Sequence, residues 1–443
     1  MPKPAMPPEG RAAARKKAMI DLEVALAHVV SNARLLPPRR VRLEEGRGRR
    51  LVAAIVADVD SPPWDRSMMD GFAVRSADLL GDGRSSEAPV TLDVVVDLAA
   101  GDASSLTIRP GSCARIMTGA PVPAGADAVV PIELAVEGTA GVHAGGVVRL
   151  VDPRFRAGQH VGLQGCAFRA GTEVLPASAL LTPAAVGLAA EAGATHVLVV
   201  PRPRVAILST GSELVAAEAV PRFGQTRNSN GPMIAAAVAV LGGEPVALGT
   251  VVDRPEPLRA AVAQGLAADI LLLSGGVSAG DLDLVPDTFR ACGVEKIFHK
   301  VRLKPGKPVW FGVFTRPDGG GRCLVFGLPG NPASSLVCFD LFVRPALASL
   351  LGWPQERLSL PRRRARLAVA AKGAEDRPVY APCRLESADD GSLVAHPLPW
   401  TGSSDLVGLA VADAYLTLAA GVRRAEAGAE VEVVMLRDDF DRA

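Results

Sequence analysis

The chain has 443 residues and a formal net charge of +1 at pH 7, and 4% of its residues are aromatic. The nearly balanced charge and the scarcity of aromatic side chains argue against a nucleic-acid partner, which would need a basic surface or stacking platforms. No run of about eighteen apolar residues is present, so the sequence predicts no membrane span. The 6 cysteines and 6 histidines lack metal-binding spacing, as is typical of a cytoplasmic protein without disulfides.

At this length we expect about three or four domains. Residues 20–36 carry apolar side chains at helical spacing, and residues 41–60 are predicted to form a second helix with an extended exit. Gly-rich extended segments and a short helix after Thr182 later return the chain to this layer. Residues 18–60 and 148–195 are therefore assigned to one discontinuous helical and extended domain, preceded by a tail without a signal-peptide core.

Residues 61–147 are predicted to form an inserted, mainly β domain, because short β-branched runs alternate with Gly- and Pro-rich turns. Two of its loops carry polar side chains suited to a site, with Asp70 before Gly71 and Thr118 before Gly119. The alternative is a pair of ordinary β-turns, since Asp-Gly and Thr-Gly sequences form turns readily.

Residues 196–352 alternate apolar strands with helices, which predicts a parallel α/β sandwich of Rossmann-like type. Asn228 and Asn230 precede one of the helices and are expected to cap it. Glu213, Asp253 and Asp283 each follow the carboxyl end of a strand, where open α/β sheets bind their ligands. Three carboxylates at one edge repel one another, so they predict a divalent metal or a shared proton.

Three features within residues 269–331 can bind an anion: a glycine-rich loop after a buried strand, the lysine-bearing turn KPGKP, and a helix start in LPGNP whose N–H groups are expected to be free. Singly, the first could be a tight strand-to-helix connection and the last a well-capped helix. Together they predict a site for a phosphorylated, nucleotide-bearing ligand with magnesium. The residues concerned are Ser274, Gly275, Gly276, Ser278, Gly280, Lys304, Lys307, Pro329, Gly330, Asn331 and Pro332.

Residues 358–443 follow a charged linker and are predicted to form a small β-barrel or β-sandwich, because short β-branched runs recur between turns. The loop that carries Ser403 and Ser404 offers hydroxyl groups to an anion, or is simply a turn.

Seven motifs occur in the order found in a known family: SMMDGFAVRSAD, RIMTGAPVPAGADAVV, RPRVAILSTGSELV, NSN before a helix, SGGVSAGDLDLV, LKPGKPVWFG and GLPGNPASS. In these motifs the chain closely resembles the molybdopterin molybdenumtransferases, bacterial enzymes similar to the E domain of gephyrin. The resemblance implies that adenylyl-molybdopterin and molybdate are substrates, that AMP is released, and that molybdenum remains on the cofactor. It also implies Mg²⁺, an upstream molybdopterin adenylyltransferase, and a homodimer of four-domain subunits with the active site between subunits.

The resemblance implies catalytic roles for Asp70, Thr118, Glu213, Asp253 and Asp283, of which Glu213, Asp253 and Asp283 would also bind the metal. It assigns substrate binding to the anion-binding residues named above and to Ser403. Two departures from the family pattern stand out. Ser212 replaces the aspartate of STGDE, and Gln159 with His160 replaces an acidic pair in a segment that relatives place near the neighbouring subunit's active site.

Two other functions stay open from the sequence alone. A related molybdopterin adenylyltransferase would share the α/β domain, but the domains on either side of it argue against that enzyme. A gephyrin-like scaffold without catalysis is the second alternative, and the retained acidic positions argue against it. The sequence does not distinguish molybdate from tungstate as the metal oxyanion.

Overall fold

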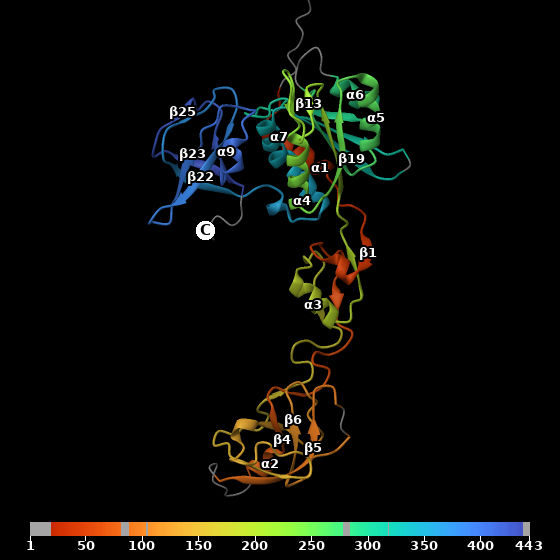
Figure 1. Ribbon diagram of the computed structural model, residues 1–443, viewed down its shortest axis with the longest axis vertical. Coiled ribbons are helices and arrows are strands. Elements are labelled where there is room, and N and C mark those ends of the chain that lie inside the picture. The colour runs from red at the N-terminus through yellow and green to blue at the C-terminus, as the bar shows by residue number, and fades with distance from the viewer. Residues whose placement is uncertain (1–18, 81–87, 103–104, 278–283, 318, 437–443) are drawn as a thin grey trace, which may run out of the picture. The chain divides into compact units, whose positions relative to one another are not determined.

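The computed structural model describes residues 19–80, 88–102, 105–277, 284–317 and 319–436. These residues form two compact units (Figure 1). One contains residues 39–199 and is called the β unit here; the other contains residues 200–443 with the segment up to residue 38 and is called the α/β unit.

A six-stranded sheet forms the centre of the α/β unit, in the order β15 (Glu244–Val251), β12 (Arg204–Thr210), β16 (Ile270–Ser274), β19 (Arg322–Leu328), β18 (Trp310–Thr315) and β17 (Glu295–His299). The first four strands are parallel, as predicted. However, β18 and β17 run antiparallel to their neighbours, so the sheet is mixed. The connection from β18 to β19 is too short for a crossover helix, and only antiparallel strands can be joined so closely.

Helices cover both faces of this sheet (Figure 1). Successive strand residues point to opposite faces, so Val205 and Ile207 join one apolar core while Ala206 and Leu208 join the other. On the second face lie α5 (Pro255–Gly265) and α6 (Val285–Ala291). On the first lie α1 (Leu22–Asn32), α4 (Asn230–Val240), α7 (Pro332–Cys338), the π-helical segment η3 (Phe339–Val343) and α8 (Arg344–Leu350).

Helix α1 packs on the α/β core rather than with residues 39–60. Its Leu22, Ala25 and Val29 are buried at a helical spacing of three to four residues and join the core beneath the first face. The segment before it is held as well, since the Ile20 N–H donates to the Lys300 carbonyl at 3.2 Å. The helical stretch Pro332–Leu350 is apolar and long enough to cross a membrane, but 83% of it is buried inside the protein. It serves as a core helix of the α/β unit.

The C-terminal strands close into a barrel, which decides between the two predicted architectures. The order is β20 (Arg362–Leu367), β23 (Leu393–Pro397), β22 (Val379–Ser387), β24 (Ala414–Leu418) and β26 (Glu430–Met435). The barrel also carries the pair β21 (Ala371–Lys372) and β25 (Arg424–Ala425) and the short helix α9 (Val407–Ala410). A buried hydrogen bond joins it to the α/β core, from the Tyr415 hydroxyl to Asp340 Oδ2 at 2.6 Å.

The β unit contains a five-stranded sheet in the order β7 (Ala128–Pro131), β4 (Gly71–Val74), β6 (Ser112–Ile116), β5 (Val90–Leu98) and β8 (Val147–Leu150). A second group of elements, with an apolar core of its own, contains the pairs β1 (Arg39–Arg42) with β11 (His196–Val199) and β2 (Ile55–Val56) with β10 (Glu173–Leu175), together with α3 (Pro183–Glu191). Smaller elements are β3 (Arg66–Ser67) with β9 (Val161–Gly162), α2 (Ser76–Leu79), η1 (Leu43–Gly46) and η2 (Ile132–Leu134).

The helix predicted over residues 41–60 is wrong. The structure has only the single 3₁₀ turn η1 there, between β1 and β2. Two glycines explain the difference. Gly48 has a φ of +74°, outside the helical region, and a Cβ at Gly46 would lie 2.8 Å from a methyl group of Leu181. Residues 41–60 are thus shaped by close packing against α3 and β11 rather than by their local helical pattern.

Candidate active site

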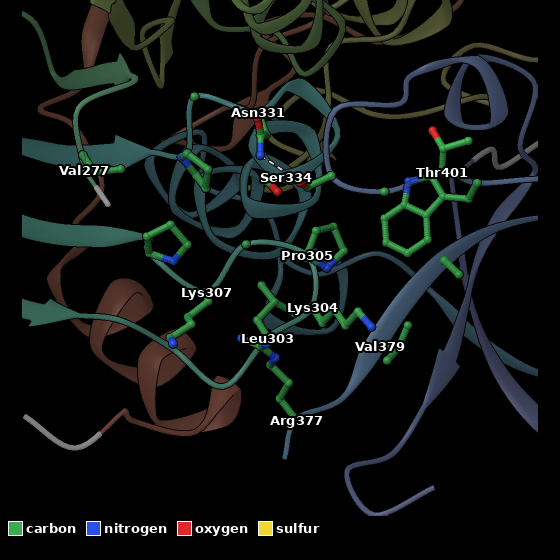
Figure 2. A pocket seen from close by; sticks show the side chains of 18 of the residues that line it. Val277, Leu303, Lys304, Pro305, Lys307, Asn331, Ser334, Arg377, Val379 and Thr401 are labelled. Carbon is green, nitrogen blue, oxygen red and sulfur yellow. Dashed lines mark hydrogen bonds between the residues drawn. The ribbon is translucent and has the colours of Figure 1, made fainter. Parts of the chain in front are cut away.

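A cavity of about 830 Å³ lies between the sheet loops of the α/β unit and the barrel. It is lined by residues that the sequence singled out for anion binding and by others from the barrel. Figure 2 shows Lys304, Lys307 and Arg377 among the side chains around it. The predicted residues that line it are Gly276, Lys304, Lys307, Pro329, Gly330, Asn331 and Ser403.

The charged side chains that line this cavity, in the part of the chain that the structure describes, are all positive. Lys304 and Lys307 face Lys372 and Arg377 from the barrel, and no aspartate or glutamate belongs to its described lining. Cationic groups gathered in a concave wall raise the local concentration of anions and form strong hydrogen bonds with phosphate or other oxyanions. We call this space the cationic cavity.

The KPGKP turn is held rigidly at the edge of the cationic cavity. The Lys304 N–H donates to the Pro378 carbonyl at 3.0 Å, and the Tyr380 N–H donates to the Lys304 carbonyl at 2.8 Å. Gly306 is required here, because its φ is +114° and a Cβ would lie 2.6 Å from Cys338 Sγ. Burial raises the pKa of the Cys338 thiol, so it stays protonated and donates to the Gly306 carbonyl at 3.4 Å.

The LPGNP segment begins α7 as predicted, but the first N–H groups of the helix are not free. Those of Ala333 and Ser334 donate to the Ser403 carbonyl at 3.0 and 3.3 Å. The Asn331 side chain makes no capping bond and instead donates from Nδ2 to Ser403 Oγ at 2.7 Å. The barrel loop therefore occupies the position that we expected an anion to take, since a carbonyl oxygen satisfies the same donors.

A second cavity, of about 490 Å³, adjoins the first and shares Gly276, Gly330 and Asn331 with it. It lies at the carboxyl ends of the parallel strands, as ligand sites in open α/β sheets do. Of the predicted residues it contains Glu213, Asp253, Ser274, Gly275 and Pro332 in addition to the shared ones. We call it the acidic cavity.

Two local contacts shape the acidic cavity. The Thr210 hydroxyl donates a close hydrogen bond to Asp253 Oδ1, which fixes that carboxylate at the end of β15. Gly275 has a φ of +104°, and a Cβ there would lie 2.3 Å from the Thr210 carbonyl oxygen. Only glycine therefore lets the chain turn away from β16 at this point.

Two of the three predicted metal ligands are among the described residues, and the third is not. Glu213 and Asp253 line the same cavity, whereas Asp283, Ser278 and Gly280 lie outside the described residues. Across the described part of the chain, no group of three or more His, Cys, Asp or Glu side chains is arranged to hold a metal. Two carboxylates are nevertheless enough for magnesium when substrate phosphates supply further ligands.

Asp70 and Thr118 are brought together within the β unit. The Thr118 N–H and hydroxyl both donate to Asp70 Oδ1 at 2.7 Å. These bonds hold the pKa of the Asp70 carboxyl below its ordinary value, so the group is ionised at neutral pH. Gly71 is needed beside it, because a Cβ would lie 2.0 Å from the Val130 carbonyl oxygen. The other described candidates all belong to the α/β unit.

The two residues that depart from the family pattern also lie in the β unit. Gln159 closes its own loop: its Nε2 donates to Asp152 Oδ2 at 2.8 Å, and its Oε1 accepts from the Arg156 N–H at 3.0 Å. His160 has a φ of 58°, and its carbonyl accepts from the Met68 N–H at 2.9 Å. Gln159 thus has a structural role in this loop.

Among the lining residues of the cationic cavity that sequence reasoning missed are two with a positive charge, Lys372 and Arg377, and the aromatic Trp400. Trp400 Nε1 is buried without a hydrogen-bond partner among the described residues. The only signal in the sequence was the presence of two basic residues shortly before the segment that forms β22. Their approach to KPGKP depends on the closure of the barrel and on its docking, which no local pattern predicts.

Three family matches cover most of the chain. Residues 20–193 match the MoeA N-terminal region (domains I and II), residues 206–349 match the probable molybdopterin binding domain, and residues 364–436 match the MoeA C-terminal region (domain IV). Molybdopterin molybdenumtransferase 2 of Mycobacterium tuberculosis is 36% identical over 416 residues, which is 91% of this chain and 96% of that protein.

Further relatives agree with these matches. Molybdopterin molybdenumtransferase of Bacillus subtilis is 33% identical over 430 residues, which is 96% of each chain. Among solved structures, the molybdopterin biosynthesis MoeA protein of Pyrococcus horikosii superposes with a TM-score of 0.76 at 30% identity, covering 95% of this chain and 100% of that one.

Proposed function

This chain belongs to the family of the molybdopterin molybdenumtransferases, enzymes of molybdenum cofactor biosynthesis, and from that premise we propose that it uses molybdate and adenylyl-molybdopterin and releases AMP. The observation that supports this reaction most directly is the pair of adjoining cavities, one cationic and one acidic. The substrates carry a phosphoanhydride and an oxyanion, which need cations, and an adenosine, which does not.

The cationic cavity is the proposed site of the negative charges. Lys304, Lys307, Lys372 and Arg377 would hold molybdate and the pterin-side phosphate of the anhydride close together, although these anions repel each other in water. Holding the two in one place favours transfer of the metal to the neighbouring dithiolene. Trp400 supplies an aromatic surface beside these cations, on which a flat pterin ring can lie.

The acidic cavity is the proposed site of the adenylyl group. Glu213 and Asp253 would hold magnesium at the strand ends, with Asp283 as a further candidate from the family motif. Magnesium would neutralise charge on the phosphate oxygens of the anhydride. The lysines of the KPGKP turn would stabilise the charge that develops as water attacks one phosphorus of the anhydride, the bridging P–O bond breaks, and AMP and the pterin phosphomonoester form.

The assembly is part of the same proposal. We expect a cytoplasmic homodimer in which Asp70 and Thr118 of the β unit contribute to catalysis, and a molybdopterin adenylyltransferase that supplies the substrate. The ionised Asp70 is suited to bind a cation, because its carboxylate keeps its charge at neutral pH.

The test is a direct assay of purified protein with adenylyl-molybdopterin, magnesium and molybdate. AMP is measured by chromatography, and molybdenum on the cofactor by metal analysis after gel filtration. We expect both products to form in equal amounts and AMP release to depend on magnesium. If AMP release does not exceed that without protein, the proposed reaction is wrong.

A further inference from the structure

Asn230 is a buried side chain in the wall of the acidic cavity whose carbonyl oxygen has no partner. It is 8% exposed, and its Nδ2 donates to the Gly330 carbonyl at 2.8 Å. That bond fixes the orientation of the amide, because only nitrogen can donate. Its Oδ1 is left buried without a hydrogen bond among the described residues. The expected capping role for Asn230 is not observed; Asn228 has that role, accepting from the Gly231 N–H at 3.0 Å.

The neighbouring polar side chains of this wall are satisfied. Ser274 Oγ donates to Ser209 Oγ at 3.2 Å, and Ser209 Oγ donates to Asn228 Oδ1 at 3.2 Å. The same asparagine donates from Nδ2 to Thr250 Oγ1 at 3.0 Å. This chain of bonds accounts for its members without any ligand. Asn230 Oδ1 stands apart from it, and a buried acceptor left unpaired costs free energy that a ligand donor would recover.

The composition of the wall indicates which kind of ligand group supplies the donor. Glu213 and Asp253 line this wall with carboxylate oxygens and Asn230 contributes its buried Oδ1; Arg227 is the one cation in the described lining, and its Nε donates to the Ala219 carbonyl. The cationic cavity next to it instead presents ammonium and guanidinium donors. A phosphate has only acceptors at neutral pH, so it fits the cationic side. A ribose has two hydroxyl donors and no charge, and strand-end acceptors bind ribose hydroxyls in other nucleotide sites of α/β sheets.

We propose that Asn230 is a specificity-determining residue whose Oδ1 accepts a hydrogen bond from a ribose hydroxyl of the adenylyl group. This inference rests on the proposed function. The hydrogen bond from Asn230 Nδ2 to the Gly330 carbonyl then also connects the two cavities, because Gly330 lines both. Asn230 thus binds the ribose hydroxyl in the acidic cavity and holds Gly330 in the wall of the cationic cavity.

The experiment measures binding of AMP, 2′-deoxy-AMP and 3′-deoxy-AMP by isothermal titration, with magnesium, to the full-length wild type and to Asn230→Ala. The wild type is expected to bind one deoxynucleotide about three- to tenfold more weakly than AMP, the effect of one neutral hydrogen bond. Asn230→Ala should bind AMP as weakly as the wild type binds that deoxynucleotide, and should not distinguish the two ligands. Asn32→Ala, on α1, is the matched control and should behave as wild type.

The outcomes separate this inference from the proposed function. A wild type that binds AMP and both deoxynucleotides equally overturns the role of Asn230 and leaves the proposed reaction standing. Equal weakening of AMP and both analogues in Asn230→Ala shows a purely structural role and also overturns it. A wild type that binds no AMP overturns both proposals. The comparison of ligands on the wild type needs no variant, so it can refute the proposal even if Asn230→Ala fails to fold.

Discussion

Replacing Arg377 by alanine should weaken binding of an oxyanion in the cationic cavity. The Arg377 side chain is 26% exposed and lines that cavity together with Lys304, Lys307 and Lys372. Two unit charges about 4 Å apart attract by roughly 4 kcal/mol at an effective dielectric constant of about 20. The cavity is open to water, and Asp376 Oδ1 lies 3.4 Å from Arg377 Nε, so part of this attraction is already cancelled.

A hydrogen bond to a charged group contributes about 1.5–3 kcal/mol, which is the better guide for this site. The dissociation constant for molybdate should therefore rise about ten- to a hundredfold in Arg377→Ala. Isothermal titration with molybdate measures it, and the difference from wild type should shrink at high salt because ions screen the site. Lys304→Ala and Lys307→Ala should weaken binding about tenfold by the same reasoning.

Arg364→Ala is the matched control, since Arg364 lies on the same barrel, is 83% exposed and pairs with Glu430 outside the cavity. It should bind molybdate as the wild type does. Unchanged affinity in Arg377→Ala, or an equal loss in the control, would refute the assignment of this cavity to the oxyanion.

Four further results are expected. Asp253→Asn should lose most AMP release at saturating magnesium while its thermal unfolding stays near wild type; near-normal turnover would remove Asp253 from the metal site. Thr118→Val should raise the pKa of Asp70, read by carboxyl NMR titration, because a donor is lost. Stability that ionised Asp70 contributes is present above the usual aspartate pKa of about 3.9 and lost as pH falls through its lower folded value. In the variant the folded pKa lies closer to the usual one, so this contribution should be smaller and its loss complete at a higher pH. His160→Asp should change AMP release by less than about tenfold at any pH, since aspartate tolerates the positive φ; a strong gain of activity would contradict this. Sedimentation equilibrium at micromolar concentration should give a dimer mass, and a mass of 45.8 kDa would exclude it.

The sequence predicted best those features that depend on neighbours along the chain. The run Ile270–Ser274 is apolar at each position but the last because both faces of β16 are buried, and this pattern sufficed to place the strand and the glycine loop after it. The acids Glu213 and Asp253 meet in one cavity for the same reason: parallel strands end at one edge.

Features that depend on distant packing were not predictable in the same way. The helix wrongly predicted over residues 41–60 is excluded by the positive φ of Gly48 and by the close packing of Gly46 against Leu181, which the apolar pattern of the segment did not reveal. The amides of α7 seemed free because the Ser403 carbonyl that binds them lies about seventy residues further along the chain, and loop closure over that distance leaves no local pattern. The positions of Lys372 and Arg377 in the cationic cavity were not predicted either, because these residues lie about seventy residues from the KPGKP turn along the chain.

Through Ser403, the barrel supplies hydrogen-bond acceptors to the first turn of α7 in the α/β core. The Ser403 carbonyl accepts hydrogen bonds from the N–H groups of Ala333 and Ser334, which have no partner within α7. The Ser403 hydroxyl accepts from Asn331 in the wall between the cavities. If the barrel tilted away, α7 would lose its partners and both cavities would lose a boundary at once. Occupancy of either cavity and docking of the barrel are therefore thermodynamically linked, so ligands should protect the amides of Ala333 and Ser334 from hydrogen exchange.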